Sequence, residues 1–150
     1  MNEEIKIQKI KETLETGQVA LETLKQAQIK LDSVKSWITI DGFGGSLIIS
    51  IVKHSKIEET LQFLEDAKKN VRKFQLQLKT IELPITVKKD VGIFVSFATF
   101  FLDGTVENYL MKEKVNDVIE QLDDAVEMVE CICRGLQMNI VGKTFVTKIL

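Results

Sequence analysis

The sequence is poor in residues that interrupt helices. It contains one proline, Pro84, and eight glycines among 150 residues. Because proline and glycine are the strongest helix breakers, their scarcity predicts long, uninterrupted helices. The length predicts one domain spanning residues 1–150, and the hydrophobic content of 45% is enough for a core.

The chain also lacks an excess of charge of either sign. Its 20 Lys and Arg residues nearly balance 22 Asp and Glu residues, so the formal net charge is −2. Proteins that bind DNA or RNA usually present a basic face to the phosphates. We therefore predict no nucleic-acid partner.

No hydrophobic run is long enough to cross a bilayer. The two most apolar runs are LIISIV (47–52) and VGIFVSFATFFL (91–102), and both fall short of the roughly 20 residues that a spanning helix needs. The first residues, MNEEIKIQKIKETLE, are charged and show no apolar segment of a secretory signal. We expect a cytoplasmic protein.

Histidine and cysteine are too scarce for the common metal and catalytic sites. His54 is the only histidine, and Cys131 and Cys133 lie two apart in a predicted helix, where their side chains point to nearly opposite faces. Zinc needs about four ligands, which this set does not supply. Ser55 adjoins His54, but neighbours in a helix point about 100° apart and do not face each other. We predict reduced thiols, no metal, no cofactor, no catalytic residue and no enzymatic activity.

What the sequence has in abundance is helical periodicity. Apolar residues recur at gaps of three, four and seven over residues 3–38, again over 57–81, and again over 115–136. The pattern predicts an all-α fold, an elongated bundle of three long helices. We call the apolar face of each such helix its seam. Gly17 lies at a seam position of the first helix, where it indicates a bend or a close contact.

Local signals set the expected helix ends. The first helix should stop at IDGFGG, the second should begin with Ser46 as its N-cap, and Leu83-Pro84 should close it. The third should follow Asp103-Gly104 and end near residues 135–139.

Two segments are ambiguous between helix and strand. ITVKKDVGIFVSFATFFL (85–102) is rich in aromatic and β-branched residues, but its pattern also fits a buried short helix, which we favour, packed across one end of the bundle. The tail MNIVGKTFVTKIL (138–150) alternates, and is predicted to be strand or irregular.

The second and third helices resemble each other. A shift of 58 aligns residues 56–78 with 114–136, with six identities and matching seams, which makes an internal helix duplication one of two explanations; the other is that amphipathic helices share seams in general. The latter half of the second helix is basic, and the third is acidic. Because opposite charges help to select helix partners, we predict that these two helices are neighbours, in one chain or across a dimer.

The glycine-rich stretch DGFGGSLIISIVKHSKI (41–57) could in principle bind phosphate at a helix N-terminus. It fails both the G-x-x-x-x-G-K-[ST] and the G-x-G-x-x-G spacing, and a helix rather than a strand precedes it. We interpret the glycines as a turn between helices. His54 could form a polar contact with Asp41 or Asp103.

Two motifs resemble an uncharacterised family of small bacterial helical proteins. The family pattern is W-x-x-x-D-x-x-G-G, then K-H-S-x-I, and later F-A-x-x-F-F-x-D-G. It is matched here by Trp37, Asp41, Gly44, Gly45, Lys53, His54, Ser55, Ile57, Phe97, Ala98, Asp103 and Gly104. Ser46 stands where relatives often carry a third glycine, and Leu102 where phenylalanine is usual. The resemblance covers roughly residues 30–136 and implies an elongated all-helical fold, without a reaction, ligand or partner.

Three hypotheses about function follow. The first is a non-enzymatic helical interaction or scaffold module that self-associates as a homo-oligomer or binds another protein, because three long helices offer more seam than one small core covers. The second, less favoured, is a peripheral membrane or immunity-type protein that uses residues 91–102. The third is a protein that binds a small anion or ligand at two glycine corners, Gly44-Gly45 and Asp103-Gly104, in a pocket lined by Trp37, Asp41 and His54.

Overall fold

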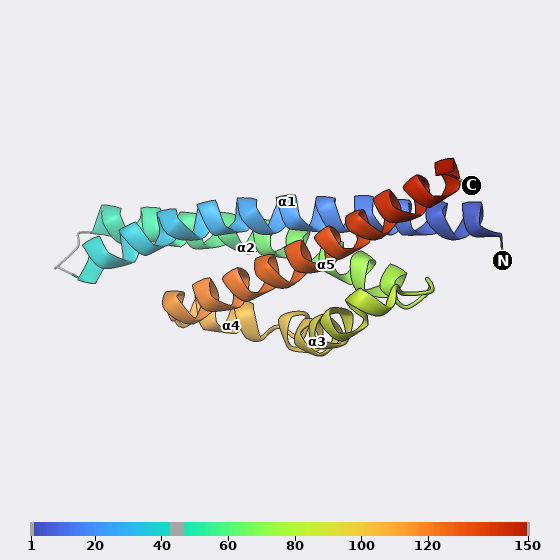
Figure 1. Ribbon diagram of the computed structural model, residues 1–150. Coiled ribbons are helices and arrows are strands. Elements are labelled where there is room, and N and C mark those ends of the chain that lie inside the picture. The colour runs from blue at the N-terminus through green and yellow to red at the C-terminus, as the bar shows by residue number, and fades with distance from the viewer. Residues whose placement is uncertain (1, 43–46, 150) are drawn as a thin grey trace.

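The computed structural model describes residues 2–42 and 47–149, and within them the side chains of residues 2–36 and 51–143. This part of the chain contains five α-helices and no β-strand: α1 (Glu3–Gly42), α2 (Leu47–Leu78), α3 (Ile85–Phe101), α4 (Thr105–Met111) and α5 (Val115–Ile149). The all-α prediction is confirmed, and the long helices α1, α2 and α5 form the elongated bundle of Figure 1.

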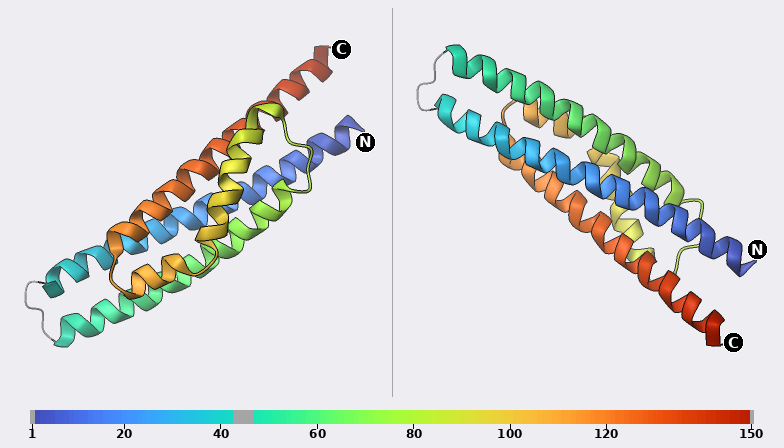
Figure 2. Two further views of the ribbon diagram at one scale, coloured as in Figure 1. Left: turned by 90° about the horizontal axis from the view of Figure 1, so that it is seen from below. Right: turned by 90° about the horizontal axis from the view of Figure 1, so that it is seen from above.

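The three long helices lie alongside one another, and α1 is the neighbour that α2 and α5 have in common. Figure 2 shows that α2 and α5 run in the same direction and that α1 runs opposite to both. Backbone contacts join α1 to α2 and α1 to α5. Over the described residues, no Cα of α2 lies within 8 Å of a Cα of α5.

The prediction that the basic and acidic helices are neighbours within the chain is therefore wrong. Charged residues of both helices pair with other elements instead: Lys68 of α2 lies 2.7 Å from Glu107 of α4, and Glu130 of α5 lies 3.1 Å from Lys25 of α1. The reason is that the apolar seams decide which faces meet, whereas exposed ion pairs contribute little. Pairing across a dimer stays a prediction.

The predicted seams form the core. On α2 and α5 the seam positions are buried, with Leu61 and Ile119 partly buried at the edge; the fully enclosed ones are Leu64, Ala67, Val71, Phe74, Leu122, Ala125, Val129, Ile132 and Leu136. Each such side chain contributes about 1–3 kcal/mol to stability, according to its size. The matched burial of the two seams agrees with both explanations of the 58-residue repeat, so duplication stays a hypothesis.

Gly17 marks a close contact. A Cβ atom at this position would lie 2.7 Å from Cys133 Sγ on α5 and 2.8 Å from the ring of Phe74 on α2. Gly17 is buried within an unbroken α1. The missing side chain thus lets α1 approach both neighbours at one level.

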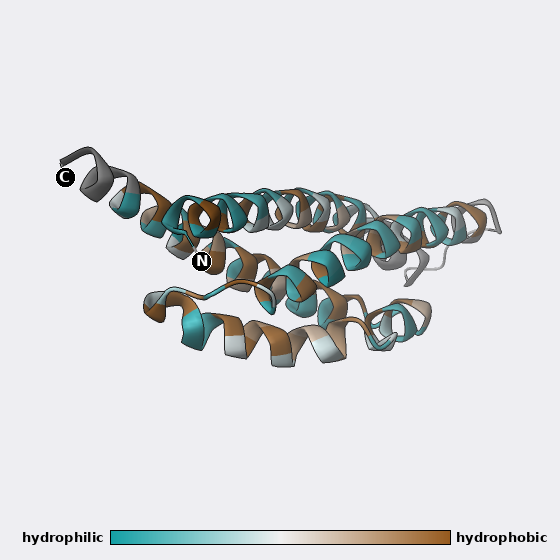
Figure 3. Cartoon of the chain, turned by 90° about the vertical axis from the view of Figure 1, so that its right-hand side faces the viewer, coloured by the Kyte–Doolittle hydropathy of each residue, from teal (hydrophilic) through white to brown (hydrophobic). Residues whose placement is uncertain are grey.

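The helices α3 and α4 form a second layer over the α2 and α5 side of the bundle (Figures 1 and 2). The segment 85–102 is a helix, as favoured, but it crosses the side of the bundle from α5 towards α2 and not one end. Val87, Val91, Phe94, Ala98 and Phe101 form its buried face. In Figure 3, α3 is coloured hydrophobic over much of its length.

Two predicted boundaries are wrong. The third helix is preceded by a separate short helix, α4, and does not end near residues 135–139, because α5 continues to Ile149. The tail is therefore helix, neither strand nor irregular. Ile140 extends the seam four residues beyond Leu136, and Gly135 is kept inside the helix by packing, since a Cβ there would lie 2.2 Å from Val87 Cγ1 of α3.

Candidate functional site

The corner motif is only partly within the described structure. Gly44, Gly45 and the predicted N-cap Ser46 lie outside it, as do the side chains of Trp37 and Asp41. The pocket predicted from Trp37, Asp41 and His54 therefore lies outside the described side chains, except for His54. That histidine is exposed on α2, and within the described part of the chain it makes no hydrogen bond or ion pair, including none to Asp103.

Lys53, the residue before the histidine, has a structural role. Its side chain is 9% exposed, and its Nζ lies 2.6 Å from Oε1 of Glu113 in the turn between α4 and α5. Glu113 has a positive φ of 59°, a left-handed conformation that is unfavourable for a side chain of this type. The ion pair thus fastens a strained turn to α2.

A second ion pair holds α4. Lys68 Nζ of α2 lies 2.7 Å from Oε1 of Glu107, and both side chains are mostly buried. The two pairs join α2 to α4 and to the turn that follows α4, so these charges position the second layer on α2.

Asp103 and Gly104 form the start of helix α4. Gly104 adopts φ 95°, and Asp103 Oδ1 accepts a hydrogen bond from the backbone N–H of Thr105 at 2.9 Å. A further hydrogen bond from the Thr105 hydroxyl holds the pKa of Asp103 below its usual value. A carboxylate that accepts N–H groups in the first turn stabilises a helix, and this accounts for the second corner without a ligand.

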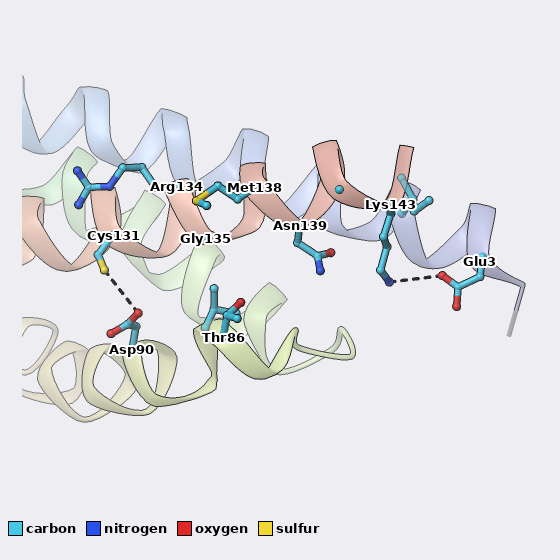
Figure 4. A pocket seen from close by; sticks show the side chains of 12 residues that line it. Glu3, Thr86, Asp90, Cys131, Arg134, Gly135, Met138, Asn139 and Lys143 are labelled. Carbon is cyan, nitrogen blue, oxygen red and sulfur yellow. Dashed lines mark hydrogen bonds and ion pairs between the residues drawn. The ribbon is translucent and has the colours of Figure 1, made fainter. Parts of the chain in front are cut away.

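A large hollow lies elsewhere in the described structure, between α3, the latter half of α5 and the start of α1 (Figure 4). It has a volume of about 900 Å³. We call it the α3–α5 groove. Its lining residues are Glu3, Ile7, Thr86, Val87, Asp90, Cys131, Arg134, Gly135, Met138, Asn139, Gly142 and Lys143.

The surface that lines the α3–α5 groove is mostly apolar, although half of its lining residues are polar or charged. The Cys131 thiol donates to Asp90 Oδ2 at 3.5 Å, and Lys143 Nζ lies 3.4 Å from Glu3 Oε2, as the dashed lines in Figure 4 show. Asn139 Oδ1 is buried without a hydrogen-bond partner in the described structure. A hollow of this size, mostly apolar with some polar groups, is typical of binding surfaces.

The cysteines do not form a reactive pair. Burial raises the pKa of Cys133 to about 11, with a further upward contribution from the charge of Glu130. Burial is also the main cause that raises the pKa of Cys131, followed by its hydrogen bond to Asp90. A nucleophilic thiol needs the opposite shift, so neither cysteine has the features of a catalytic one.

The outer face of α3 carries three exposed large apolar side chains. Ile85 is 85% exposed, Phe100 67% and Ile93 49%. Between them lies Gly92, where a Cβ would meet no atom within 4 Å. Exposed apolar side chains gathered on one helix mark an interaction surface more often than singly scattered ones do.

Other chemistries find little support in the described residues. No group of three or more His, Cys, Asp or Glu side chains there could hold a metal ion. None of the helices, as far as they are described, is long and apolar enough to cross a membrane.

Searches of protein family models, curated proteins and solved structures found no match to the chain. The resemblance to an uncharacterised bacterial family consequently stays a prediction.

Sequence reasoning missed the α3–α5 groove because part of its wall lies at or beyond the expected end of the third helix. Met138, Asn139 and Lys143 belong to the continued α5. A signal was present: no proline follows Gly135, and Ile140 keeps the spacing of the seam. The meeting of Asp90 with Cys131 depends on how α3 crosses α5, and no local pattern carries that information.

Proposed function

We propose that the protein is a non-enzymatic helical interaction module that associates with itself or with another protein through apolar surface on α3 and α5. The observation that carries the proposal is the uncovered apolar face of α3, with Ile85, Ile93 and Phe100 exposed. An exposed phenylalanine and isoleucines on a helix that also supplies core residues are costly in water, and a partner that covers them removes this cost.

The α3–α5 groove adds to this surface. Met138 on its wall is 75% exposed, and Val141 follows on the same helix with more than half of its surface in solvent. Apolar side chains beside a hollow give a partner both area and shape to pack against, the two features of well-packed interface centres.

The proposal is tested by photo-cross-linking inside cells that make the protein. A photoreactive phenylalanine analogue replaces Phe100 in one variant and Met138 in another, and Lys11, an exposed polar position on α1, in the control. We expect discrete adducts from the apolar positions and none from Lys11. If all three positions give the same diffuse background, the interaction module is ruled out.

The membrane alternative makes a different prediction for the same face. A peripheral contact through Phe100 would carry the protein upward with lipid vesicles in a flotation experiment, for neutral or anionic vesicles. A protein that acts only as an interaction module should remain at the bottom of the gradient, apart from the vesicles. Flotation that is lost in Phe100→Ser would replace the proposed function with the membrane one.

A further inference from the structure

One stripe runs along the exposed side of α3 and into the following turn. Its positions recur at gaps of three and four residues, which places them on one helix face, and the burial pattern shows each as exposed. The stripe consists of Ile85, Lys89, Gly92, Ser96, Phe100 and Asp103. Figure 1 shows that α3 is the outermost element on its side of the molecule, so nothing in the described chain covers this face.

No neighbouring atom of the described structure accounts for Gly92, the glycine of the stripe. Glycine is the least favourable residue inside a helix apart from proline, and it is normally explained by a close neighbour. Gly17 and Gly135 have such neighbours, whereas a Cβ on Gly92, like one on Gly142, would meet no described atom within 4 Å. Eight residues further on, Phe100 projects a large ring that is 67% exposed. The face thus contains both a notch and a projecting side chain.

The charges of the stripe are also complementary between two antiparallel copies of the helix. Lys89 lies before the notch, and Asp103 lies after the projecting ring. Both are exposed, and within the described structure neither takes part in an ion pair. A helix that carries a cation at one end and an anion at the other presents opposite charges to an antiparallel copy of itself.

We propose, on the basis of the proposed interaction function, that the covering partner of α3 is the α3 of a second copy, packed antiparallel about a two-fold axis at Ser96. Pairing Phe100 of one copy with Gly92 of the other centres the register on Ser96. The same register places Lys89 of one copy opposite Asp103 of the other. In this one register the Phe100 ring fills the notch at Gly92 and the opposite charges pair. By symmetry each of these contacts occurs twice.

The small residues at the centre explain how the helices approach. The distance between two packed helices depends on the side chains at their crossing point, and serine and glycine allow the shorter distances. Ile93 and Thr99 lie opposite each other beside the axis in this register. A single helix pair buries less surface than a standard interface does, so the dimer is a weak one that forms at micromolar to higher concentrations.

A cysteine placed on the axis tests the register. In a Cys131→Ser background, Ser96→Cys brings two thiols together at the centre of the dimer, whereas the control Lys88→Cys keeps them about 24 Å apart along the helices. With oxidised glutathione we expect rapid disulfide-linked dimers of Ser96→Cys only. Equal rates for the two variants, or no dimer from either, would overturn the pairing.

Variants of the notch and ring separate association from folding. Gly92→Leu fills the notch while the isolated helix tolerates leucine well, and Phe100→Ser removes the ring. Each variant should slow the formation of the Ser96→Cys disulfide at least tenfold, while the helical circular dichroism signal stays the same. The matched control is Ile29→Ser, since Ile29 on α1 is 68% exposed, as Phe100 is, and lies on another face. Cross-linking that persists in Gly92→Leu would contradict the proposal.

The self-pairing of α3 and the broader interaction function can be refuted independently. If photo-cross-linking at Phe100 captures another protein and Ser96→Cys gives no dimer, the self-pairing of α3 is overturned and the interaction module stands. If neither experiment gives an adduct, both are wrong.

Discussion

Alanine at Gly17 measures how closely α1 approaches its two neighbours. The new Cβ would lie 2.7 Å from Cys133 Sγ and 2.8 Å from the Phe74 ring, distances that real Cβ atoms do not adopt. Phe74 is completely buried, so its ring has little room to move. Overpacking of this kind costs about 1–3 kcal/mol. Replacing a helical glycine by alanine returns about 1 kcal/mol. The expected net result is a loss of about 1 kcal/mol.

Gly92 is the matched control, because the same substitution there meets open space. Gly92→Ala should therefore stabilise the chain by about 0.5–1 kcal/mol through helix propensity alone. The gap between the two variants is about 2 kcal/mol, although the chemical change is identical. For a domain of this size, that gap is about 4–8 °C in Tm.

Urea unfolding followed by circular dichroism measures both variants, at a protein concentration low enough to keep the chain monomeric. A double-mutant cycle with Cys133→Ala adds specificity, since removing the sulfur should recover part of the loss, a coupling of at least about 0.5 kcal/mol. If Gly17→Ala stabilises the protein as much as Gly92→Ala does, α1 does not pack against α2 and α5 as described.

Three further predictions concern single contacts. Glu107→Gln should destabilise the fold by about 1–3 kcal/mol, because it leaves the mostly buried Lys68 charge unpaired; the apolar pair Lys68→Met/Glu107→Leu should recover most of this in urea unfolding, and no recovery would argue against the ion pair. Asp103→Ala should destabilise the start of α4 by removing the hydrogen bond to the Thr105 N–H, whereas Asp103→Asn should destabilise it less, and equal losses in urea unfolding would refute the capping role. Burial raises the pKa of Cys133 from 9.0 to about 11, so above pH 9 the unfolded thiol ionises while the folded one stays protonated; stability should fall between pH 9 and 11, less steeply in Cys133→Ala, and parallel pH profiles would contradict the burial.

Much of the fold could be predicted from spacing alone. The seams of α1, α2 and α5 are buried where the apolar period places them, because a helix that repeats apolar residues at gaps of three and four has one face to cover. Gly17 was recognisable as a departure from the seam. The helix at 85–102 was favoured on the same ground.

The remainder depends on information that local patterns do not contain. The choice of α1 as the shared neighbour follows from how three seams pack together, and the charges of α2 and α5 are too exposed to decide it. The turn before α5 depends on the left-handed Glu113, a residue type that rarely adopts this conformation. The residues of α3 and α5 that line the α3–α5 groove come together only because α3 crosses α5 beside Gly135.

Sedimentation equilibrium of the unmodified protein measures whether two copies pair through α3. The chain has a mass of 17.0 kDa. We expect a weight-average mass that rises from this value towards twice it as the concentration increases from a few to hundreds of micromolar, and that stays at the monomer value in Phe100→Ser. A mass that remains monomeric throughout, or a dimer unaffected by Phe100→Ser, would contradict the pairing of two copies through α3.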